Sequence, residues 1–382
     1  MNRIEELFDK RSIIGVKIEK IISERGYTKK DLCENAGLSR PTLDKLLAGT
    51  LTCKTNYEKH IAKVMKFLEI TPDILLGNIK HEYNRTRELK KIMKISSEQV
   101  AKATNISLSR LEAIEAGEQA SLAELRDIAM CFSISVSCLL GKNFFEPQIS
   151  ELDLIINSRE MVEQEEISGF WGHIGVSLCN SEKIYYFPIT SSVRKMLYNV
   201  MNNERIVVPC MNNKVLYINM QYVKELILLD EGVEPPNFIG WDYNVDNGEI
   251  PLVMYEALED YLFDDTDEDI ISSKLKICLR NLIEKKELTV DDIYEMVDCS
   301  NIYYSDGKIR LIEIDFSQEE SVSEEIEGVY LYEDAQCAEN ILYCTDIRGM
   351  EIILNMKNIA MLEVPFLKVE NKICKMQEEV YE

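Results

Sequence analysis

The side chains whose types and spacing most clearly suit ligand binding lie in the stretch TKKDLCENAGLSRPTLDKLLAGT, residues 28–50. Helical spacing after Ser39 places three leucines on one face of a short helix and polar residues on the other. The polar face carries Arg40, Thr42 and Lys45. Arginine and lysine side chains donate hydrogen bonds and accept none. The stretch therefore predicts a short, rigid helix with a polar, partly basic face.

Catalytic and metal-binding motifs are missing from the sequence. It has no H-E-x-x-H, no G-x-S-x-G and no phosphate-binding glycine loop. The serines and lysine of TSSVRKM match the start of a helix better than a peptidase dyad, and three histidines are too few for a cupin-type or zinc site. The acidic run DDTDEDI lacks the glycine and terminal glutamate of a calcium loop, which favours a solvated linker. We expect no enzymatic activity, no cofactor and no metal.

Two closely spaced helices must position the basic face. Thr28 is a suitable N-cap for the first helix, and Gly37 can end it in the left-handed conformation. Ser39 is a suitable N-cap for the second helix, and Pro41 falls in its first turn, where a missing N–H costs little. A helix of about ten residues is marginal alone, so neighbouring elements must hold it.

This stretch resembles the helix-turn-helix of the XRE family, the phage-repressor and Cro type. The flanking segments strengthen the resemblance: IIGVKIEKIISERGYT is similar to the family's first helix, and NYEKHIAKVMKFLEITPDILLG to its fourth and fifth. The resemblance covers about residues 13–77. It implies an all-α, five-helix domain whose third helix enters the major groove of double-stranded DNA.

The resemblance also implies six side chains that contact DNA. They are Lys29 for phosphate, Ser39 and Thr42 for the backbone or bases, and Arg40, Pro41 and Lys45 for bases. Lys29 stands where the family often has glutamine, and it would hold phosphate as a point charge. Because the Pro41 side chain cannot hydrogen-bond a base, base reading would depend on Arg40 and Lys45.

The motif then repeats in ISSEQVAKATNISLSRLEAIEAGEQ, which aligns with the first copy without a gap. Ser96, Asn105 and Ser107 take the places of the first cap, the turn glycine and the second cap. LAELRDIAMCFSISVSCLLG then resembles the fourth and fifth helices. The chain is therefore expected to begin with two XRE-like domains in tandem.

The second copy has a less basic face than the first. Arg110 is its only cation at a position that would contact DNA, and Glu112, Glu115 and Glu118 would repel phosphates. Two interpretations follow from the sequence. Either Arg110 contacts DNA, or this copy serves as a dimer or inter-domain surface.

Charge and cysteine content point to a cytoplasmic protein that divides into two parts. The net charge is −24, but residues 1–150 hold 24 Lys and Arg against 20 Asp and Glu, whereas residues 151–382 hold 19 against 47. The 11 cysteines form no C-x-x-C pair, which is typical of a reducing compartment. We expect no signal peptide, and no uncharged run is long enough to span a membrane.

The remaining chain shows strand-like runs on both sides of an acidic, more helical stretch. The segment GMEIILNMKNIAMLEV echoes KVLYINMQYVKELIL, with Asn355 and Met356 in the places of Asn219 and Met220. The echo predicts two copies of a small α+β or β-barrel-like module, although two unrelated β-hairpins could also share it.

The expected fold class is α+β multidomain, with tandem all-α helix-turn-helix domains followed by strand-rich α+β modules. The expected domains are residues 1–80, 81–145, 146–232, 233–299 and 300–382, the fourth being an acidic helical connector.

Together these patterns indicate a cytoplasmic, DNA-binding transcription regulator, a repressor in particular, whose C-terminal half serves sensing or assembly. Its expected partners are double-stranded DNA, a second copy in a homodimer, and a protein or small-molecule effector at the C-terminal half. The alternative is an antitoxin-like or protein-interaction adaptor that acts through its acidic C-terminal half.

Overall fold

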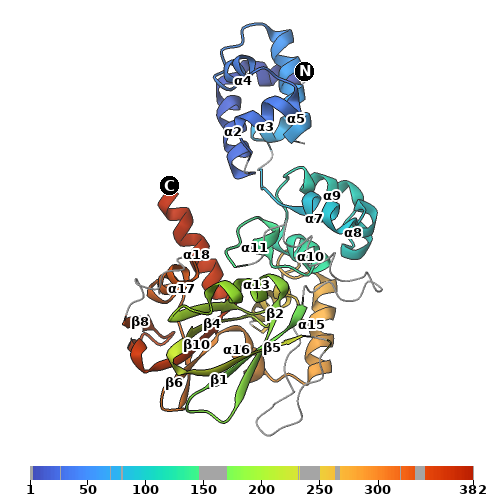
Figure 1. Ribbon diagram of the computed structural model, residues 1–382. Helices are drawn as coiled ribbons and strands as arrows, with labels where there is room; N and C mark the ends of the chain where they lie inside the picture. The colour runs from blue at the N-terminus through green and yellow to red at the C-terminus, as the bar shows by residue number, and fades with distance from the viewer. Residues whose placement is uncertain are drawn as a thin grey trace. The chain divides into compact units, whose positions relative to one another are not determined.

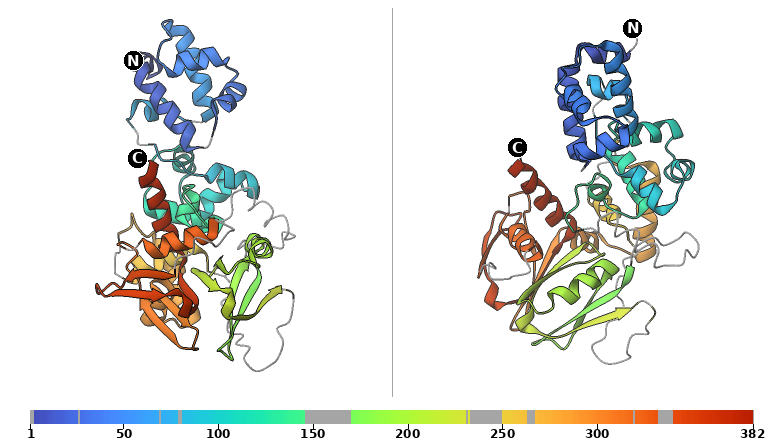
Figure 2. Two further views of the ribbon diagram at one scale, coloured as in Figure 1. Left: turned by 60° about the vertical axis from the view of Figure 1, so that its left-hand side comes forward. Right: turned by 45° about the horizontal axis from the view of Figure 1, so that its top comes forward.

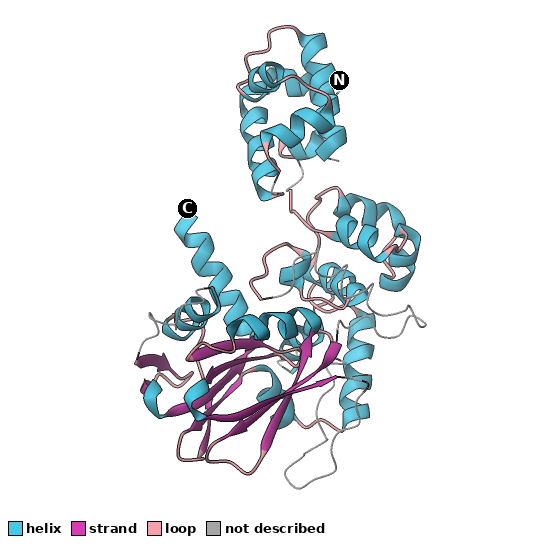
Figure 3. Cartoon of the chain, viewed as in Figure 1, coloured by secondary structure: helices cyan, strands magenta, loops and turns pink. Residues whose placement is uncertain are grey.

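The computed structural model describes residues 3–25, 27–68, 70–78, 81–145, 170–230, 232, 250–262, 267–318, 320–331 and 340–381. The chain divides into two compact units, Met1–Glu124 and Leu125–Glu382 (Figure 1). The described part of the first unit is helical apart from an isolated bridge, and every named strand belongs to the second (Figure 3). The expected order, a helical N-terminal region before a strand-rich α+β region, is confirmed.

The described part of residues 1–80 contains six helices. They are α1 (Arg3–Asp9), α2 (Arg11–Glu24), α3 (Lys29–Ala36), α4 (Arg40–Leu47), α5 (Lys54–Leu68) and α6 (Pro72–Leu76). The last five match the expected helices, and α1 is an addition that the sequence reading missed. Its Leu7 is fully buried in the same core as Ile18, Leu32 and Leu43, so α1 is part of the domain.

Gly15 sets the distance between α2 and α4. A Cβ atom at this position would lie 1.7 Å from the carbonyl oxygen of Leu47 at the end of α4. No side chain fits there without a backbone shift. Gly15 therefore allows α2 to pack closely against the C-terminal end of α4.

Five further helices follow in residues 81–145. They are α7 (Thr86–Met93), α8 (Ser97–Thr104), α9 (Leu108–Glu115), α10 (Leu122–Phe132) and α11 (Val136–Leu139). The division between the two units falls within α10, between Glu124 and Leu125. Arg126 of α10 pairs with Asp260, and Phe145 lies in the main core of the second unit.

The second unit contains ten described strands in three sheets. They are β1 (Phe170–Leu178), β2 (Ile184–Thr190), β3 (Arg205–Pro209), β4 (Lys214–Asn219), β5 (Val223–Asp230), β6 (Cys299–Tyr304), β7 (Ile309–Glu313), β8 (Ile341–Thr345), β9 (Glu351–Asn355) and β10 (Ile359–Pro365). The strand orders are β2-β1-β5, β3-β4-β10-β6-β7 and β8-β9, and all pairings are antiparallel.

The five-stranded sheet lies between two hydrophobic cores. One core joins it to β1, β2 and helix α13 (Ser191–Val200). The other joins its opposite face to the β8-β9 hairpin and to helices α14 (Leu252–Leu262), α15 (Ser273–Lys286), α16 (Val290–Val297), α17 (Ser321–Leu331) and α18 (Phe366–Tyr381). In the left view of Figure 2 the green strands and the orange-to-red strands form the two sides of this unit.

The region expected as an acidic helical connector holds α14, α15 and α16, so its described part is helical. Residues 146–169 and 233–249, and part of the acidic run at 264–270, lie outside the described residues. In the described ranges, no helix has the length and apolarity needed to cross a membrane.

The predicted repeat is present as a repeated element order. Strands β1 to β5 with α13 follow the order hairpin, helix, hairpin, 3₁₀ turn, strand, and β6 to β10 with α17 follow the same order. The two 3₁₀ turns are η1 (Met220–Tyr222) and η3 (Met356–Asn358).

Backbone register recurs at the same spacing. Arg205 pairs with Asn219 in the first copy, and Ile341 pairs with Asn355 in the second, each residue 136 positions further on. Left-handed turn residues recur at the same offset, with φ of 58° at Asn213 and 82° at Gly349.

The two copies are not separate domains. Strand β4 of the first copy pairs with β10 of the second, which places strands from residues 205–219 and 299–365 in one sheet. The expected modules at 146–232 and 300–382 thus both contribute strands to this sheet. Backbone pairing between the copies joins them into a single unit.

Candidate nucleic-acid interface

Helix α3 begins at a reciprocal cap. The Thr28 hydroxyl accepts a hydrogen bond from the Asp31 backbone N–H at 3.2 Å, and the Thr28 N–H donates to Asp31 Oδ2 at 2.7 Å. Hydrogen bonds from Thr28 lower the pKa of Asp31, because they stabilise the carboxylate. The expected cap at Thr28 is confirmed, and it fixes where the first helix starts.

The turn between α3 and α4 is short and fixed. Gly37 has a φ of 58°, the left-handed conformation that the sequence predicts. The Leu38 N–H donates to the Cys33 carbonyl at 2.9 Å, and Lys63 Nζ donates to the Gly37 carbonyl at 3.2 Å. These bonds hold the direction of the chain as it enters α4.

Ser39 caps α4 as expected. Its hydroxyl accepts from the Thr42 backbone N–H at 3.4 Å and lies 2.7 Å from the Thr42 hydroxyl. Pro41 occupies the first turn. On the opposite face, Leu43 and Leu46 are no more than 1% exposed, so the apolar side anchors the helix in the core. The polar side of α4 is thereby directed outward.

The cations of the first copy lie at the surface. Arg40 pairs with Asp44 at 3.3 Å while its side chain remains 55% exposed, and Lys29 pairs with Glu19 at 2.6 Å. Lys45 is exposed and forms no ion pair with any described residue. Exposed ion pairs contribute little free energy, so Arg40 and Lys29 can exchange these partners for phosphate or bases at small cost.

The second helix pair, α8 and α9, is capped in the same way. Ser96 and Gln99 form a reciprocal cap at the start of α8, and Ser107 accepts from the Arg110 N–H at 3.3 Å at the start of α9. Asn105 takes the place of Gly37 with a φ of 61°. The local geometry predicted from the sequence alignment is present in both pairs.

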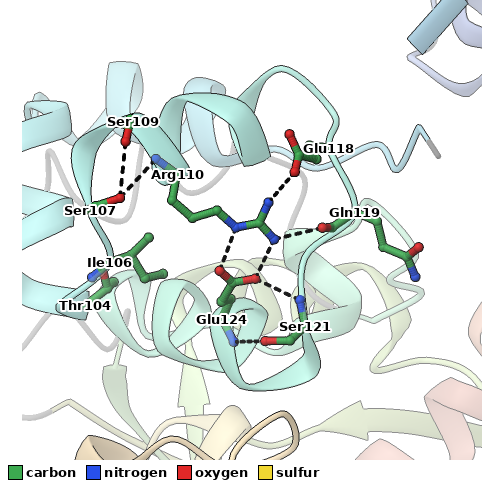
Figure 4. Close-up of polar contacts among 9 residues, drawn as sticks. All are labelled: Thr104, Ile106, Ser107, Ser109, Arg110, Glu118, Gln119, Ser121 and Glu124. Atoms are coloured by element: carbon green, nitrogen blue, oxygen red, sulfur yellow. Dashed lines mark hydrogen bonds and ion pairs between the residues drawn. The ribbon is translucent and has the colours of Figure 1, made fainter. Parts of the chain in front are cut away.

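Arg110 is surrounded by acceptors from its own unit (Figure 4). Its Nε and Nη2 each donate to Glu124, at 2.7 and 2.8 Å, and its Nη1 donates to Glu118 at 2.7 Å. Nη2 also donates to the Gln119 carbonyl at 2.9 Å. The two carboxylates raise the pKa of Arg110, with the Glu124 hydrogen bond as the largest cause. The expected DNA-contacting guanidinium is therefore already bound on three nitrogens.

Acidic residues near α9 also differ from their expected role. Glu115 is 8% exposed and pairs with Lys90 and with Arg87, and Glu118 pairs with Arg110. These two carboxylates are neutralised by cations rather than presented to phosphates. Glu112 is exposed and remains the one member of the expected acidic set without an ion pair among the described residues.

The sequence reading missed the partners that orient these side chains. Glu19, Lys63 and Glu124 lie 10, 26 and 14 residues from the groups they contact. Only the Arg40–Asp44 pair has a local signal, since residues four apart are neighbours on a helix.

Metal-binding side chains are dispersed over the described residues. These residues contain no group of three or more histidine, cysteine or acidic side chains that could hold a metal ion. Their ten cysteines are all free thiols. The arrangement at α3 and α4 instead provides exposed donors on a rigid helix, which suits recognition of an acceptor-rich surface.

Comparison with known proteins gives one family match. Residues 17–80 match the Cro/C1-type HTH DNA-binding domain. The match supports an XRE-type helix-turn-helix regulator and covers α3, α4 and most of α2. It does not extend to α8 and α9 or to the C-terminal unit. No curated protein and no solved structure matches the chain at a significant level.

Proposed function

We propose that the chain is a sequence-specific transcription regulator, a repressor, that reads double-stranded DNA with α4. The observation that carries the proposal is the orientation of this helix in a Cro/C1-type domain. Its leucines are buried, while Arg40 and Lys45 are exposed on the opposite side. In a helix-turn-helix the N-terminal side chains of the second helix reach base edges in the major groove.

Each side chain of the first copy has a distinct proposed role. Arg40 and Lys45 donate to base edges, with guanine as the preferred partner of the arginine. Ser39 and Thr42 contact the backbone or bases, and Lys29 contacts phosphate at the start of α3. Pro41 makes apolar contact only, because it has no side-chain donor.

The second helix pair is proposed as a helix-turn-helix that has a structural role. The four hydrogen bonds of Arg110 support this, since a base contact would require breaking them. Its helix α10 also continues into the C-terminal unit. We propose that this pair links the reading domain to the rest of the protein.

The C-terminal unit is proposed to act in sensing or assembly in the cytoplasm, without catalysis or a cofactor. Residues 151–382 carry 19 Lys and Arg against 47 Asp and Glu, a balance that disfavours contact with DNA. The same acidity supports the alternative, an antitoxin-like adaptor that binds a basic protein through this unit.

The test is selection of bound fragments from a random DNA library by the full-length protein, followed by binding measurements on the enriched sequence. The proposal expects a defined motif whose affinity falls for Arg40→Ala and Lys45→Ala. Lys59→Ala, an exposed lysine on α5, is the matched control and should bind normally. Enrichment of no motif, or equal affinity of all three variants for the motif, would reject DNA reading by α4 and favour the adaptor.

A further inference from the structure

The two copies of the C-terminal repeat meet at one strand junction. In it, β4 of the first copy pairs antiparallel with β10 of the second, and Tyr217 lies opposite Leu362. Each of these strands has a counterpart 136 residues away in the other copy. The counterpart of β4 is β9, and the counterpart of β10 is β5.

The equivalent junction between β9 and β5 is not formed within the chain. Among the described strands, β5 pairs with β1 alone and β9 pairs with β8 alone. Each strand therefore leaves one edge unpaired by any described strand. An edge with unpaired N–H and C=O groups is a template for pairing with another strand.

One of the two apolar faces of the β8-β9 hairpin is uncovered as well. Ile341, Tyr343 and Ile353 are 44%, 54% and 66% exposed. Their counterparts in the first copy are Arg205, Val207 and Tyr217, which are between 1% and 9% exposed.

The second copy covers that face in the first. Its helix α17 packs against β3, and Glu325 of this helix accepts hydrogen bonds from Tyr217 at 2.6 Å and Arg205 at 3.2 Å. What one copy supplies to the other thus comprises a strand edge and a helix. In the described structure, the β8-β9 hairpin has no helix on its exposed face and no strand paired at the open edge of β9.

The two open edges lie on opposite sides of the second unit. Strand β5 (yellow-green) and the β8-β9 hairpin (red) are separated by the five-stranded sheet in Figures 1 and 2. The open edge of β5 carries partly buried apolar residues, Leu226, Ile227 and Leu228. A single chain cannot join two edges placed in this way.

We propose that a second copy of this chain pairs its β5 edge with the β9 edge of the first, repeating the β4-β10 junction between molecules. The resulting sheet has the order β2-β1-β5-β9-β8, equivalent to β7-β6-β10-β4-β3 within the chain. Within the chain, Leu362 of β10 lies opposite Tyr217 of β4. The residues 136 positions away from these two are Leu226 and Ile353, so Leu226 of one molecule should lie opposite Ile353 of the other. Helix α13 of the second molecule then covers the exposed face of the first molecule's β8-β9 hairpin. Within one chain, α17 covers β3 in the same way.

Such an interface is heterologous, because the two molecules contribute different surfaces. It closes into a ring or continues as an open chain, according to the rotation between neighbours. The assembly would bring several DNA-reading domains onto one complex. This inference concerns assembly alone and holds whether or not α4 reads DNA.

The test uses the full-length protein and three lysine substitutions. Ile353→Lys places a charge on the β9 face, and Ile227→Lys places one at the β5 edge. Ile277→Lys on α15 is the matched control, since Ile277 is 57% exposed and lies outside both edges. Molar mass is measured by light scattering over a concentration series, and folding is checked by thermal denaturation.

The wild-type mass should exceed that of one chain, 44.1 kDa, and should rise with concentration. Ile353→Lys and Ile227→Lys should each lower it, and Ile277→Lys should not. An equimolar mixture of the first two variants should regain mass, because each retains the edge that the other has lost. A wild-type mass of one chain at all concentrations, unchanged masses in both edge variants, or no recovery in the mixture would overturn the proposal.

A cross-link tests the register. Chains carrying Leu226→Cys and Ile353→Cys, each with the exposed Cys53 and Cys179 replaced by serine, should form a disulfide-linked dimer when mixed and oxidised that neither chain forms alone. Lys224→Cys, two residues along β5, is the control for register. Equal cross-linking from positions 224 and 226 would contradict the proposed pairing.

Discussion

The helix pairs α3-α4 and α8-α9 share their caps and differ in how their cations are used. Both begin with a reciprocal cap and turn through a left-handed residue, and both start their second helix at a serine. Arg40 of the first pair stays more than half exposed beside one carboxylate. Arg110 of the second is held by two carboxylates and a backbone carbonyl.

The pairs also differ in how they attach to the preceding helix. In the first, Gly15 of α2 lets the backbone approach Leu47 of α4. In the second, the position equivalent to Leu47 is Glu115, which pairs with Arg87 and Lys90 of α7. Similar local geometry is therefore supported by close packing in one pair and by buried ion pairs in the other. The two pairs therefore share their local capping and differ in the contacts that hold them to the preceding helix.

The largest expected effect on DNA binding separates the two helix pairs. Arg40→Ala and Lys45→Ala should each weaken binding to a selected sequence by about 1–3 kcal/mol, mainly at the base pair contacted. Arg110→Ala should have a much smaller effect, because its guanidinium is already engaged. Fluorescence anisotropy with single-base variants of the site measures both. Equal losses of DNA affinity for Arg40→Ala and Arg110→Ala would show that the two helix pairs do not differ in DNA binding.

A second prediction concerns stability of the first pair. Gly15→Ala should destabilise the N-terminal unit by roughly 3 kcal/mol, because the added Cβ forces α2 away from α4. Gly328→Ala in α17 is the control, since a Cβ there meets nothing within 4 Å, and it should be neutral or stabilising. Urea denaturation of both variants compares them. Similar unfolding midpoints for Gly15→Ala and Gly328→Ala would show that α2 and α4 are not closely packed.

A third prediction concerns the ion-pair cluster of the second pair. Arg110→Ala should destabilise the N-terminal unit by about 1 kcal/mol, since two carboxylates lose a hydrogen-bonded partner. The Arg110 hydrogen bond lowers the pKa of Glu124 from its usual value of 4.5. The stabilisation is therefore complete above about pH 4.5 and is lost as the pH falls through the lowered pKa.

The difference in free energy of unfolding between wild type and Arg110→Ala should consequently shrink in acid. Denaturation at pH 7 and at pH 3 measures it, with Arg40→Ala as the exposed control. A difference that does not depend on pH would mean that Glu124 is not the partner that matters.

The smallest effect is expected at Lys29. Lys29→Ala should weaken binding about equally for all DNA sequences and should reduce the slope of log affinity against log salt by about 1. Lys30→Ala, a neighbouring and more exposed lysine, is the control. A loss confined to particular base pairs would assign Lys29 to base reading instead of phosphate contact.

The sequence by itself determined the features that depend on residues close along the chain. The caps at Thr28, Ser39, Ser96 and Ser107 each involve a partner three residues away, so residue type and spacing suffice to predict them. The repeat in the C-terminal half was visible at Asn219 and Asn355 for the same reason, since a strand, a tight turn and a second strand form a local pattern.

Only the tertiary structure decided which groups Arg110 contacts, where in α10 the two units divide, and how the two repeats pair. Glu124 lies 14 residues from Arg110, and β4 is separated from β10 by more than 130 residues. A strand pattern specifies which residues point inward but not which of several similar edges will pair. That choice depends on the free energy of the whole packed unit, which no single segment contains.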